Sequence, residues 1–167
     1  MTTEAQADRD LALEQQVCFT LTVASREVVS LYRPLLEPLG LTHPQYLVMI
    51  SMWGAAGPRS FRELTRLLKL EAPTLSPLLK RLENAGLVER KRDPADERSV
   101  LVRLTERGRD LRARAAHVPT AVFERLGMST RELESLQDVL SEVIEHTRAA
   151  DVAPGAVNGV AATVSPA

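Results

Sequence analysis

The only cysteine of the 167-residue chain, Cys18, lies in the stretch LEQQVCFTL near the amino terminus. A single cysteine cannot form an internal disulfide, so we expect a non-covalently stabilised protein in a reducing, cytoplasmic compartment. A free cysteine on a helix flank is most often a small buried hydrophobe. It becomes a redox centre only where hydrogen bonds or positive charge stabilise its thiolate. The residue types alone leave both interpretations of Cys18 open.

Other motifs for catalysis are missing from the sequence. The histidines His43, His117 and His146 do not have metal-site spacing with Cys18, and there is no glycine-rich phosphate loop, so neither a metal nor a cofactor is expected. A thiol peroxidase would be the enzymatic alternative, but no second cysteine supports turnover, so the sequence predicts a non-enzyme. No stretch reaches the roughly 18 consecutive apolar residues of a membrane span, and no signal peptide is predicted.

Positive charge is concentrated in the middle of the chain. Residues 59–114 carry 15 Lys and Arg against 9 Asp and Glu, a net charge of +6, whereas the other residues carry 6 against 13, a net charge of −7. A basic centre between acidic ends indicates a polyanionic partner such as nucleic acid. An unevenly charged, solvated surface is the simpler alternative.

The elements that must position these residues follow from apolar periodicity. Apolar residues at helical spacing from Leu13 to Leu35 predict one long helix that carries Cys18. A short, strongly apolar helix is predicted over 44–53, with Pro44 in its first turn. Two further helices joined by a tight turn, over 60–70 and 71–86, form a helix-turn-helix pattern.

The hydrophobic period then changes from helical to two. LVERK and SVLVRL alternate like β-strands, and the polar turn RDPADER between them predicts a β-hairpin with a charged tip. A helix over 105–127 follows, which we expect to be capped by Thr105 and bent at Pro119. Ser129 and Glu132 form a capping box that opens a final amphipathic helix.

A helix-turn-helix followed by a β-hairpin is a winged helix, and it coincides with the basic centre. In such a fold the second helix enters the major groove with its N-terminal residues leading, while the wing reaches an adjacent groove. The predicted groove or phosphate contacts are Thr74 and Ser76. The predicted phosphate neutralisers are Lys80, Arg81, Arg90 and Arg92. Arg98 is predicted to enter the minor groove, oriented by Asp96.

The segment LLKRLENAGLVERKRDPADERSVLVRLTERG resembles the DNA-binding core of the MarR family of winged-helix repressors, including the wing pattern met here by Asp96 and Arg98. The similarity extends from about Leu13 to about Thr147. LEQQVCFTL, ASREV, YRPLLEPLGLTHPQYLVM and TLSPLLKRLE resemble the organic-hydroperoxide-resistance repressor (OhrR) branch. The resemblance implies a homodimer with interlocking terminal helices, whose two winged helices straddle a near-palindromic double-stranded DNA operator.

The expected fold is therefore mainly α with a small β-hairpin, a winged helix-turn-helix whose N- and C-terminal helices form a dimerisation domain. The expected divisions are a disordered N-terminus (1–10), dimerisation helices with the sensor cysteine (11–56), the DNA-binding region (57–104), C-terminal dimerisation helices (105–150) and a disordered tail (151–167).

The resemblance also implies a role for Cys18, because the branch has its peroxide-sensing cysteine in the same QxCF context. Tyrosine hydroxyls support the thiolate in that branch; Tyr32 matches one of these tyrosines, whereas His43 and Thr22 stand at two others. Tyr32 follows Cys18 by 14 residues, about 21 Å along one helix, so the pair can meet only between subunits. His43 is either a hydrogen-bond donor to the thiolate or a helix-start residue without a role.

The implied function is a repressor that senses organic hydroperoxides by oxidation of Cys18 and then releases its operator, derepressing a peroxide-detoxification gene. The sulfenic acid would form a mixed disulfide with a low-molecular-mass thiol, cyclise to a sulfenamide or be over-oxidised. The alternative is a MarR-type repressor relieved by a reversible small aromatic ligand, with Cys18 not a sensor. Ala72 and Pro73 replace the branch's usual Ser–Gly, with Glu71 as a partial substitute cap, so the DNA preference is expected to differ.

Overall fold

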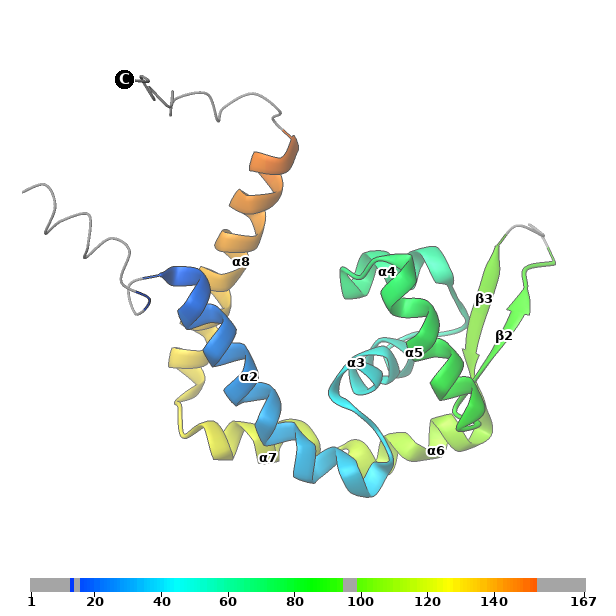
Figure 1. Cartoon of the computed structure of the whole chain (residues 1–167). Helices are drawn as coiled ribbons and strands as arrows, with labels where there is room; N and C mark the ends of the chain where they lie inside the picture. The colour runs from blue at the N-terminus through cyan, green and yellow to red at the C-terminus, as the bar shows by residue number, and fades with distance from the viewer. Residues whose placement is uncertain (1–12, 14–15, 95–98, 153–167) are drawn as a thin grey trace, which may run out of the picture. The chain divides into compact units, whose positions relative to one another are not determined.

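The computed structural model describes residues 13, 16–94 and 99–152. They form a mostly helical fold with one small antiparallel sheet (Figure 1), which confirms the predicted fold class. The chain divides into two compact units, Met1–Leu126 and Gly127–Ala167. The predicted disordered segment 1–10 lies outside the described residues, as does the predicted tail except for its first two residues, which belong to the last helix.

In the first unit, helix α2 spans Val17–Leu36, which is continuous as predicted but starts four residues after Leu13. A short 3-10 turn, η2 (Glu37–Leu39), ends at Gly40, whose φ of 69° is one that glycine adopts without strain. Helix α3, His43–Trp53, follows, and Thr42 and Gln45 form a capping box at its N-terminus. In this box Gln45 accepts the backbone N–H of Thr42, 2.8 Å away.

The winged helix comprises β1 (Arg59–Ser60), α4 (Phe61–Leu68), α5 (Ala72–Asn84), β2 (Val88–Arg92) and β3 (Val100–Leu104). The hairpin of β2 and β3 is present as predicted, with Arg90 opposite Val102. A third strand, β1, pairs with the other edge of β3, so the sheet order is β1-β3-β2. The two-residue β1 was not predicted.

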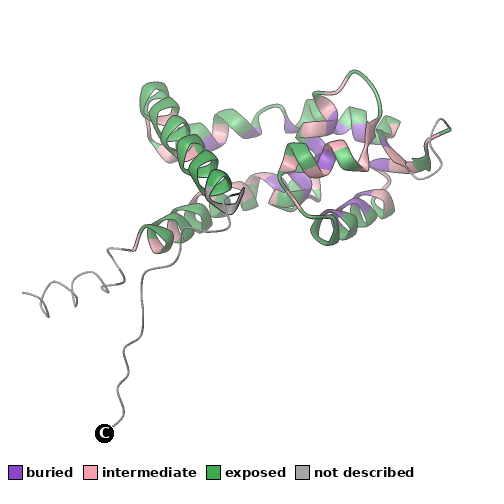
Figure 2. Cartoon of the chain, turned by 90° about the horizontal axis from the view of Figure 1, so that it is seen from above, coloured by how far each residue is buried: buried purple, intermediate pink, exposed green. Residues whose placement is uncertain are grey.

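The core of this unit lies where α3, α4, α5 and the sheet meet (Figure 2). Its fully buried side chains come from every one of these elements and include Met49, Met52, Leu64, Leu75, Leu79, Leu82, Val88 and Val102. Burial of such side chains is the main stabilising contribution to a domain of this size. Helix α5, the second helix of the helix-turn-helix, therefore packs on the core through its apolar face. Its opposite face is accessible to solvent or to a partner.

The segment after the sheet forms two helices, α6 (Glu106–Ala115) and α7 (Val118–Leu126). The prediction of one helix bent at Pro119 is wrong, because the chain leaves the helix before the proline. Pro119 lies in the first turn of α7, where its missing N–H costs no helical hydrogen bond. Helix α7 packs against α2, and Arg125 donates a hydrogen bond of 3.2 Å to the carbonyl of Leu31.

Helix α6 approaches the start of β2 at Gly108. A Cβ atom on Gly108 would lie 2.0 Å from the carbonyl oxygen of Leu87, a distance that no side chain can occupy. The carbonyl of Gly108 accepts a hydrogen bond of 2.8 Å from Nε1 of Trp53 on α3. Gly108 thus joins α3, α6 and the sheet in one packed junction.

In the second unit, the described residues form one helix, α8, Thr130–Val152. The predicted capping box is present: Glu132 accepts the backbone N–H of Ser129 at 2.7 Å, and Ser129 Oγ accepts the N–H of Glu132 at 3.3 Å. Two charge-assisted hydrogen bonds from Ser129 lower the pKa of Glu132. Along this helix Leu136, Val139, Val143 and Ile144 are exposed.

Candidate functional site

Helix α5 presents its polar residues on the face opposite the core. Leu75, Leu78, Leu79 and Leu82 are buried. The exposed residues include all four that the sequence predicted for DNA contact on this helix, Thr74, Ser76, Lys80 and Arg81. The structure therefore brings these four predicted contacts onto one accessible helix.

The start of α5 differs from the expectation for Glu71. Glu71 is the N-cap residue, but its side chain makes no capping hydrogen bond, so its predicted role as a substitute cap is wrong. The backbone closes the first turn instead, with the N–H of Thr74 donating to the carbonyl of Glu71 at 3.0 Å. Pro73 fixes φ in that first turn. Pro77 is the sixth residue of the helix, so the one hydrogen bond it removes lies near the helix start.

The wing strand β2 carries one acidic side chain followed by three basic ones. Lys91 and Arg92 are exposed on β2, and Glu89 forms ion pairs with Lys91 at 3.3 Å and with Arg103. Lys91 was not among the predicted DNA contacts, although it lies directly beside the predicted Arg92. Asp96 and Arg98, predicted for the minor groove, lie outside the described residues.

Arg90 has a partner inside the protein. Its Nε and Nη2 atoms donate to Oε2 of Glu83 at 2.9 and 2.7 Å, and its backbone N–H donates to Oε1 of Glu83 at 3.1 Å. The ion pair between Arg90 and Glu83 links β2 to the C-terminal end of α5. Arg90 was predicted to neutralise phosphate, whereas in the structure its guanidinium is paired with Glu83, a contact that sequence spacing does not reveal.

The Glu83–Arg90 pair predicts an acid-dependent part of the stability. The hydrogen bonds from Arg90 hold the pKa of Glu83 below its ordinary value of 4.5, so the pair stabilises the fold above that pH and loses this effect as pH falls through the lowered pKa. Because both side chains are about a third exposed, we expect Glu83→Gln to cost about 1 kcal/mol or less at neutral pH, and nothing at an acidic pH below the lowered pKa of Glu83. Urea unfolding at the two pH values measures this.

Glu124→Gln on α7 is the matched control, because Glu124 is exposed and has no ion pair among the described residues. It should change stability equally little at both pH values. A Glu83→Gln variant whose stability deficit persisted undiminished at the lower pH would contradict the assignment.

Cys18 is the second residue of α2 and is exposed, so it is not a buried packing residue of its own chain. Its neighbours Val17 and Leu21 are also exposed. The hydroxyl of Thr22 donates to the backbone carbonyl of Cys18 at 2.7 Å. The single hydroxyl proton of Thr22 is therefore engaged and does not serve the Cys18 sulfur.

Tyr32 and His43 lie together, away from Cys18 of the same chain. Their ring centroids are 4.6 Å apart, Tyr32 is 6.0 Å from Tyr46, and Tyr46 is 6.3 Å from Trp53. Burial lowers the pKa of His43, so its imidazole is neutral at neutral pH. Tyr32 follows Cys18 by 14 residues on α2, about 21 Å along the axis, so the predicted separation within one chain is confirmed.

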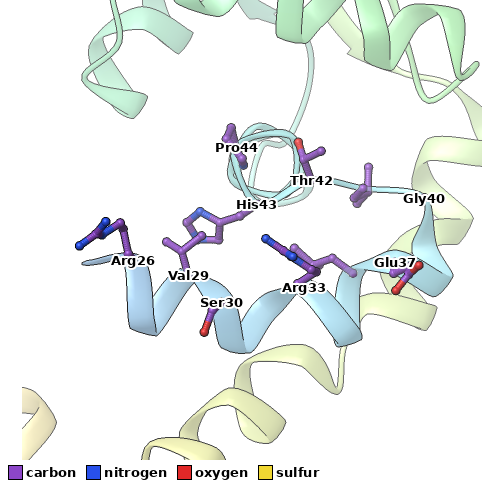
Figure 3. Close-up of a pocket in the computed structure, with 11 residues that line it drawn as sticks. Arg26, Val29, Ser30, Arg33, Glu37, Gly40, Thr42, His43 and Pro44 are labelled. Carbon is purple, nitrogen blue, oxygen red and sulfur yellow. The ribbon is translucent and has the colours of Figure 1, made fainter. Parts of the chain in front are cut away.

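A cavity of about 780 Å³ lies between α2 and the segment that leads into α3 (Figure 3). His43 lines it, so the cavity adjoins the pair of Tyr32 and His43. Its apolar wall includes Val29, Leu36 and Leu41. Its residues with polar side chains are Arg26, Ser30, Arg33, Glu37, Thr42 and His43. No sequence pattern predicted this cavity.

Within the part of the chain that the structure describes, no three His, Cys, Asp or Glu side chains are grouped so that they could hold a metal ion. No helix in that part has the length and apolar character needed to cross a membrane.

Comparisons with known proteins agree with this geometry. A family model described as transcriptional regulator SarA/Rot matches residues 30–114. The organic hydroperoxide resistance transcriptional regulator of Bacillus subtilis is 38% identical over 135 residues, which cover 81% of this chain and 91% of that protein.

Two solved structures show the same fold. AbfR, which is known from Staphylococcus epidermidis, matches in its reduced, DNA-bound form with a TM-score of 0.69 and 29% identity, covering 84% of this chain and 98% of that one. AbsC of Streptomyces coelicolor, a MarR family transcriptional regulator, matches with a TM-score of 0.68 and 27% identity over 78% of this chain and 90% of that one. These relatives are transcriptional regulators and not enzymes, and the chain belongs to the MarR family of winged-helix DNA-binding regulators.

Proposed function

We propose that this regulator is a repressor that senses organic hydroperoxides through Cys18 and releases its operator when Cys18 is oxidised. The observation that carries the proposal is the exposure of the only cysteine at the start of α2. The similarity to an organic hydroperoxide resistance regulator supports it. The positive end of the α2 dipole favours an anion at this position, as a thiolate nucleophile requires.

The sensing centre is formed by two copies of the chain. Tyr32 is too far along α2 to support the thiolate of its own Cys18, so a homodimer has to bring the two residues together. Uncovered apolar side chains on α2 and α8 support this assembly, since they gain from burial against a second copy. They are Val17, Leu21, Val29, Leu136, Val139, Val143 and Ile144.

The chemistry follows from the thiolate. The Cys18 sulfur attacks the terminal oxygen of the hydroperoxide ROOH, an S–O bond forms and the O–O bond breaks. Two electrons pass from sulfur to the peroxide, and the alkoxide leaves and takes a proton from water to become ROH. Cys18 is then a sulfenic acid.

A low-molecular-mass thiol then attacks the sulfenic sulfur, forming a mixed disulfide and releasing water. We favour this product as the trigger for DNA release, because overoxidised AbfR has been observed bound to DNA. In that relative, added oxygen atoms are compatible with DNA binding. A mixed disulfide adds far more bulk between the subunits, and it needs no second cysteine.

The DNA partner is a near-palindromic duplex that the dimer binds with both winged helices. Thr74 and Ser76 at the start of α5 contact the groove or its phosphates, and Lys80, Arg81 and Arg92 neutralise phosphates. The support is their exposure on one helix and on the adjoining wing strand. The proposal retains the predicted roles of Asp96 and Arg98 at the wing, with Arg98 in the minor groove and Asp96 orienting it.

The test compares wild type with Cys18→Ser by fluorescence anisotropy on the DNA upstream of the protein's own gene. Wild type should release DNA at near-stoichiometric cumene hydroperoxide and need more hydrogen peroxide, while Cys18→Ser binds equally well and stays bound. If both proteins bind and neither releases, the redox proposal is wrong. The second candidate is then a repressor relieved by a reversible small aromatic ligand, which the cavity beside α2 favours.

A further inference from the structure

We propose that a groove between α3 and α4 receives residues 8–13 of a second copy of the chain, the segment that precedes Cys18. The inference rests on the proposed function for the dimer and adds an interaction surface to it. In that dimer the start of α2 of one copy lies beside Tyr32 and His43 of the other. The contact connects the sensing end of one copy to the helix-turn-helix of the other.

The groove has a volume of about 410 Å³ and an apolar lining. Leu47 and Ile50 line it from α3, and Leu67 lines it from α4. All three of these large apolar side chains are exposed, Leu67 by as much as 51%. Apolar side chains gathered around one groove are typical of a surface that another protein segment covers.

Helix α3 is apolar on both sides. Met49 and Met52 are buried on its inner side, whereas Leu47 and Ile50 are exposed on its outer side. A helix that is apolar all round is ordinarily buried on every side. Together with His43, the two exposed residues are spaced by four and three, so they form one stripe of the helix. The stripe starts at the residue proposed to lie near the thiol of the second copy and leads into the groove.

The length of the chain before Cys18 fits this path. Leu11 precedes Cys18 by seven residues, which span at most about 24 Å when extended. The stripe from His43 to Ile50 is only about 10 Å long. The same segment of the chain's own N-terminus starts about 22 Å from Tyr32 along α2 and would have to turn back over that whole length. The second copy is therefore the favoured occupant.

The charges of the two surfaces are complementary. Residues 1–16 carry four acidic residues and one arginine, a net charge of −3, whereas residues 59–69 carry four basic residues and one glutamate, a net charge of +3. Arg59 lines the groove, and its Nε donates to the carbonyl of Ser51 at 3.0 Å, which holds the guanidinium at the rim. Arg59 has no ion pair among the described residues.

The sequence of the segment, DRDLAL at residues 8–13, matches the groove in both respects. Asp8 and Asp10 supply carboxylates that a guanidinium binds through charge-assisted hydrogen bonds. Leu11 and Leu13 follow directly and supply apolar side chains, whose burial against α3 and α4 stabilises the contact.

The direct test asks whether the two surfaces meet. Leu11→Cys and Ile50→Cys are introduced together into the Cys18→Ser protein, and oxidation by copper phenanthroline is followed on a non-reducing gel. The introduced thiols should link most chains into a covalent dimer, since a disulfide needs Cα atoms within about 7 Å. A faster-migrating monomer would place the segment on its own chain and overturn the inference. No disulfide, either here or with Leu13→Cys in place of Leu11→Cys, would also overturn it.

Two controls separate docking from random collision. Leu11→Cys alone in the same background reports pairing between the two N-terminal segments. Leu11→Cys/Arg112→Cys places the second thiol on an exposed position of α6, outside the groove. Neither control should link more than a small fraction of the chains. Crosslinking of the α6 variant to the same extent as Leu11→Cys/Ile50→Cys would contradict a specific contact.

The second test measures what the contact contributes to dimerisation. Leu67→Ser should raise the dimer dissociation constant about tenfold in sedimentation experiments, because each of two grooves loses part of a leucine contact. Leu67→Met retains an apolar side chain and should behave as wild type. Leu11→Ser should act like Leu67→Ser and add little to it, since both remove the same contact. Fully additive effects of the two serine variants would contradict the docking.

Neither test requires peroxide, so this inference and the redox proposal can fail separately. If cumene hydroperoxide releases wild type from DNA but the groove is not crosslinked, only the docking is wrong. If the crosslink forms but cumene hydroperoxide does not modify Cys18, the docking is supported and the redox function is wrong. A protein that sediments only as a monomer would overturn both.

Discussion

Gly108→Ala is expected to destabilise the protein by about 3 kcal/mol, although alanine is ordinarily the better helix former by about 1 kcal/mol. Alanine destabilises the protein at this position because the new Cβ would fall 2.0 Å from the carbonyl oxygen and 3.0 Å from the carbonyl carbon of Leu87. The backbone of Leu87 cannot yield easily, because its carbonyl accepts the N–H of Thr105 at 3.1 Å. Urea unfolding followed by circular dichroism measures the loss.

Gly54→Ala is the control for this substitution. Gly54 ends α3 at an ordinary φ of −81°, and its Cβ would meet the carbonyl oxygen of Ile50 at a normal 3.6 Å. We expect its effect to stay within about 0.5 kcal/mol. Unfolding of Gly108→Ala at or above the wild-type midpoint would mean that α6 does not pack against Leu87 as described.

Lys80→Gln/Arg81→Gln is expected to weaken DNA binding by about 100-fold at physiological salt. Both side chains are exposed on α5 and have no ion pair among the described residues, so the fold should not depend on them. In the proposed dimer the double variant removes four proposed phosphate contacts. The slope of log affinity against log salt concentration should then flatten by roughly 3 to 4.

Anisotropy titrations over a range of salt concentrations measure both quantities. Arg112→Gln/Arg131→Gln removes the same charge from α6 and α8, outside the recognition helix, and should change affinity by less than about threefold. If both double variants weakened DNA binding equally, the loss of affinity would come from the lower net charge of the protein and not from lost contacts between α5 and phosphate. An unchanged salt slope for Lys80→Gln/Arg81→Gln would place these side chains away from phosphate.

Much of the fold is predictable because its determinants are local. Ser60 and Glu63 form the capping box over which α4 starts, with the Glu63 carboxylate accepting from Ser60 at 2.6 and 2.9 Å. Thr105 caps α6 by accepting the N–H of Gly108 at 3.0 Å. Each motif joins two residues that are three positions apart, so both partners of the hydrogen bond can be recognised from a short stretch of sequence.

The features that were not predicted depend on contacts between different elements, which no local pattern of the sequence contains. Strand β1 exists only because Arg59 and Ser60 meet β3, and a pair of residues has no periodicity of its own. The Glu83–Arg90 pair connects a helix to a strand, and the cavity forms where α2 meets the start of α3. The candidate thiol site was predictable in its residue types, but the contact between Tyr32 and His43 required the fold.

The junction at Gly108 gives the protein a spectroscopic reporter of its own. Trp53 is the only tryptophan of the chain, its indole N–H is bonded to Gly108, and its ring packs edge-on against Tyr46. Emission excited at the red edge of indole absorption therefore arises from this one position, between α3 and α6. A shift in its wavelength or lifetime reports rearrangement of that joint directly, without a dye and without altering a single residue.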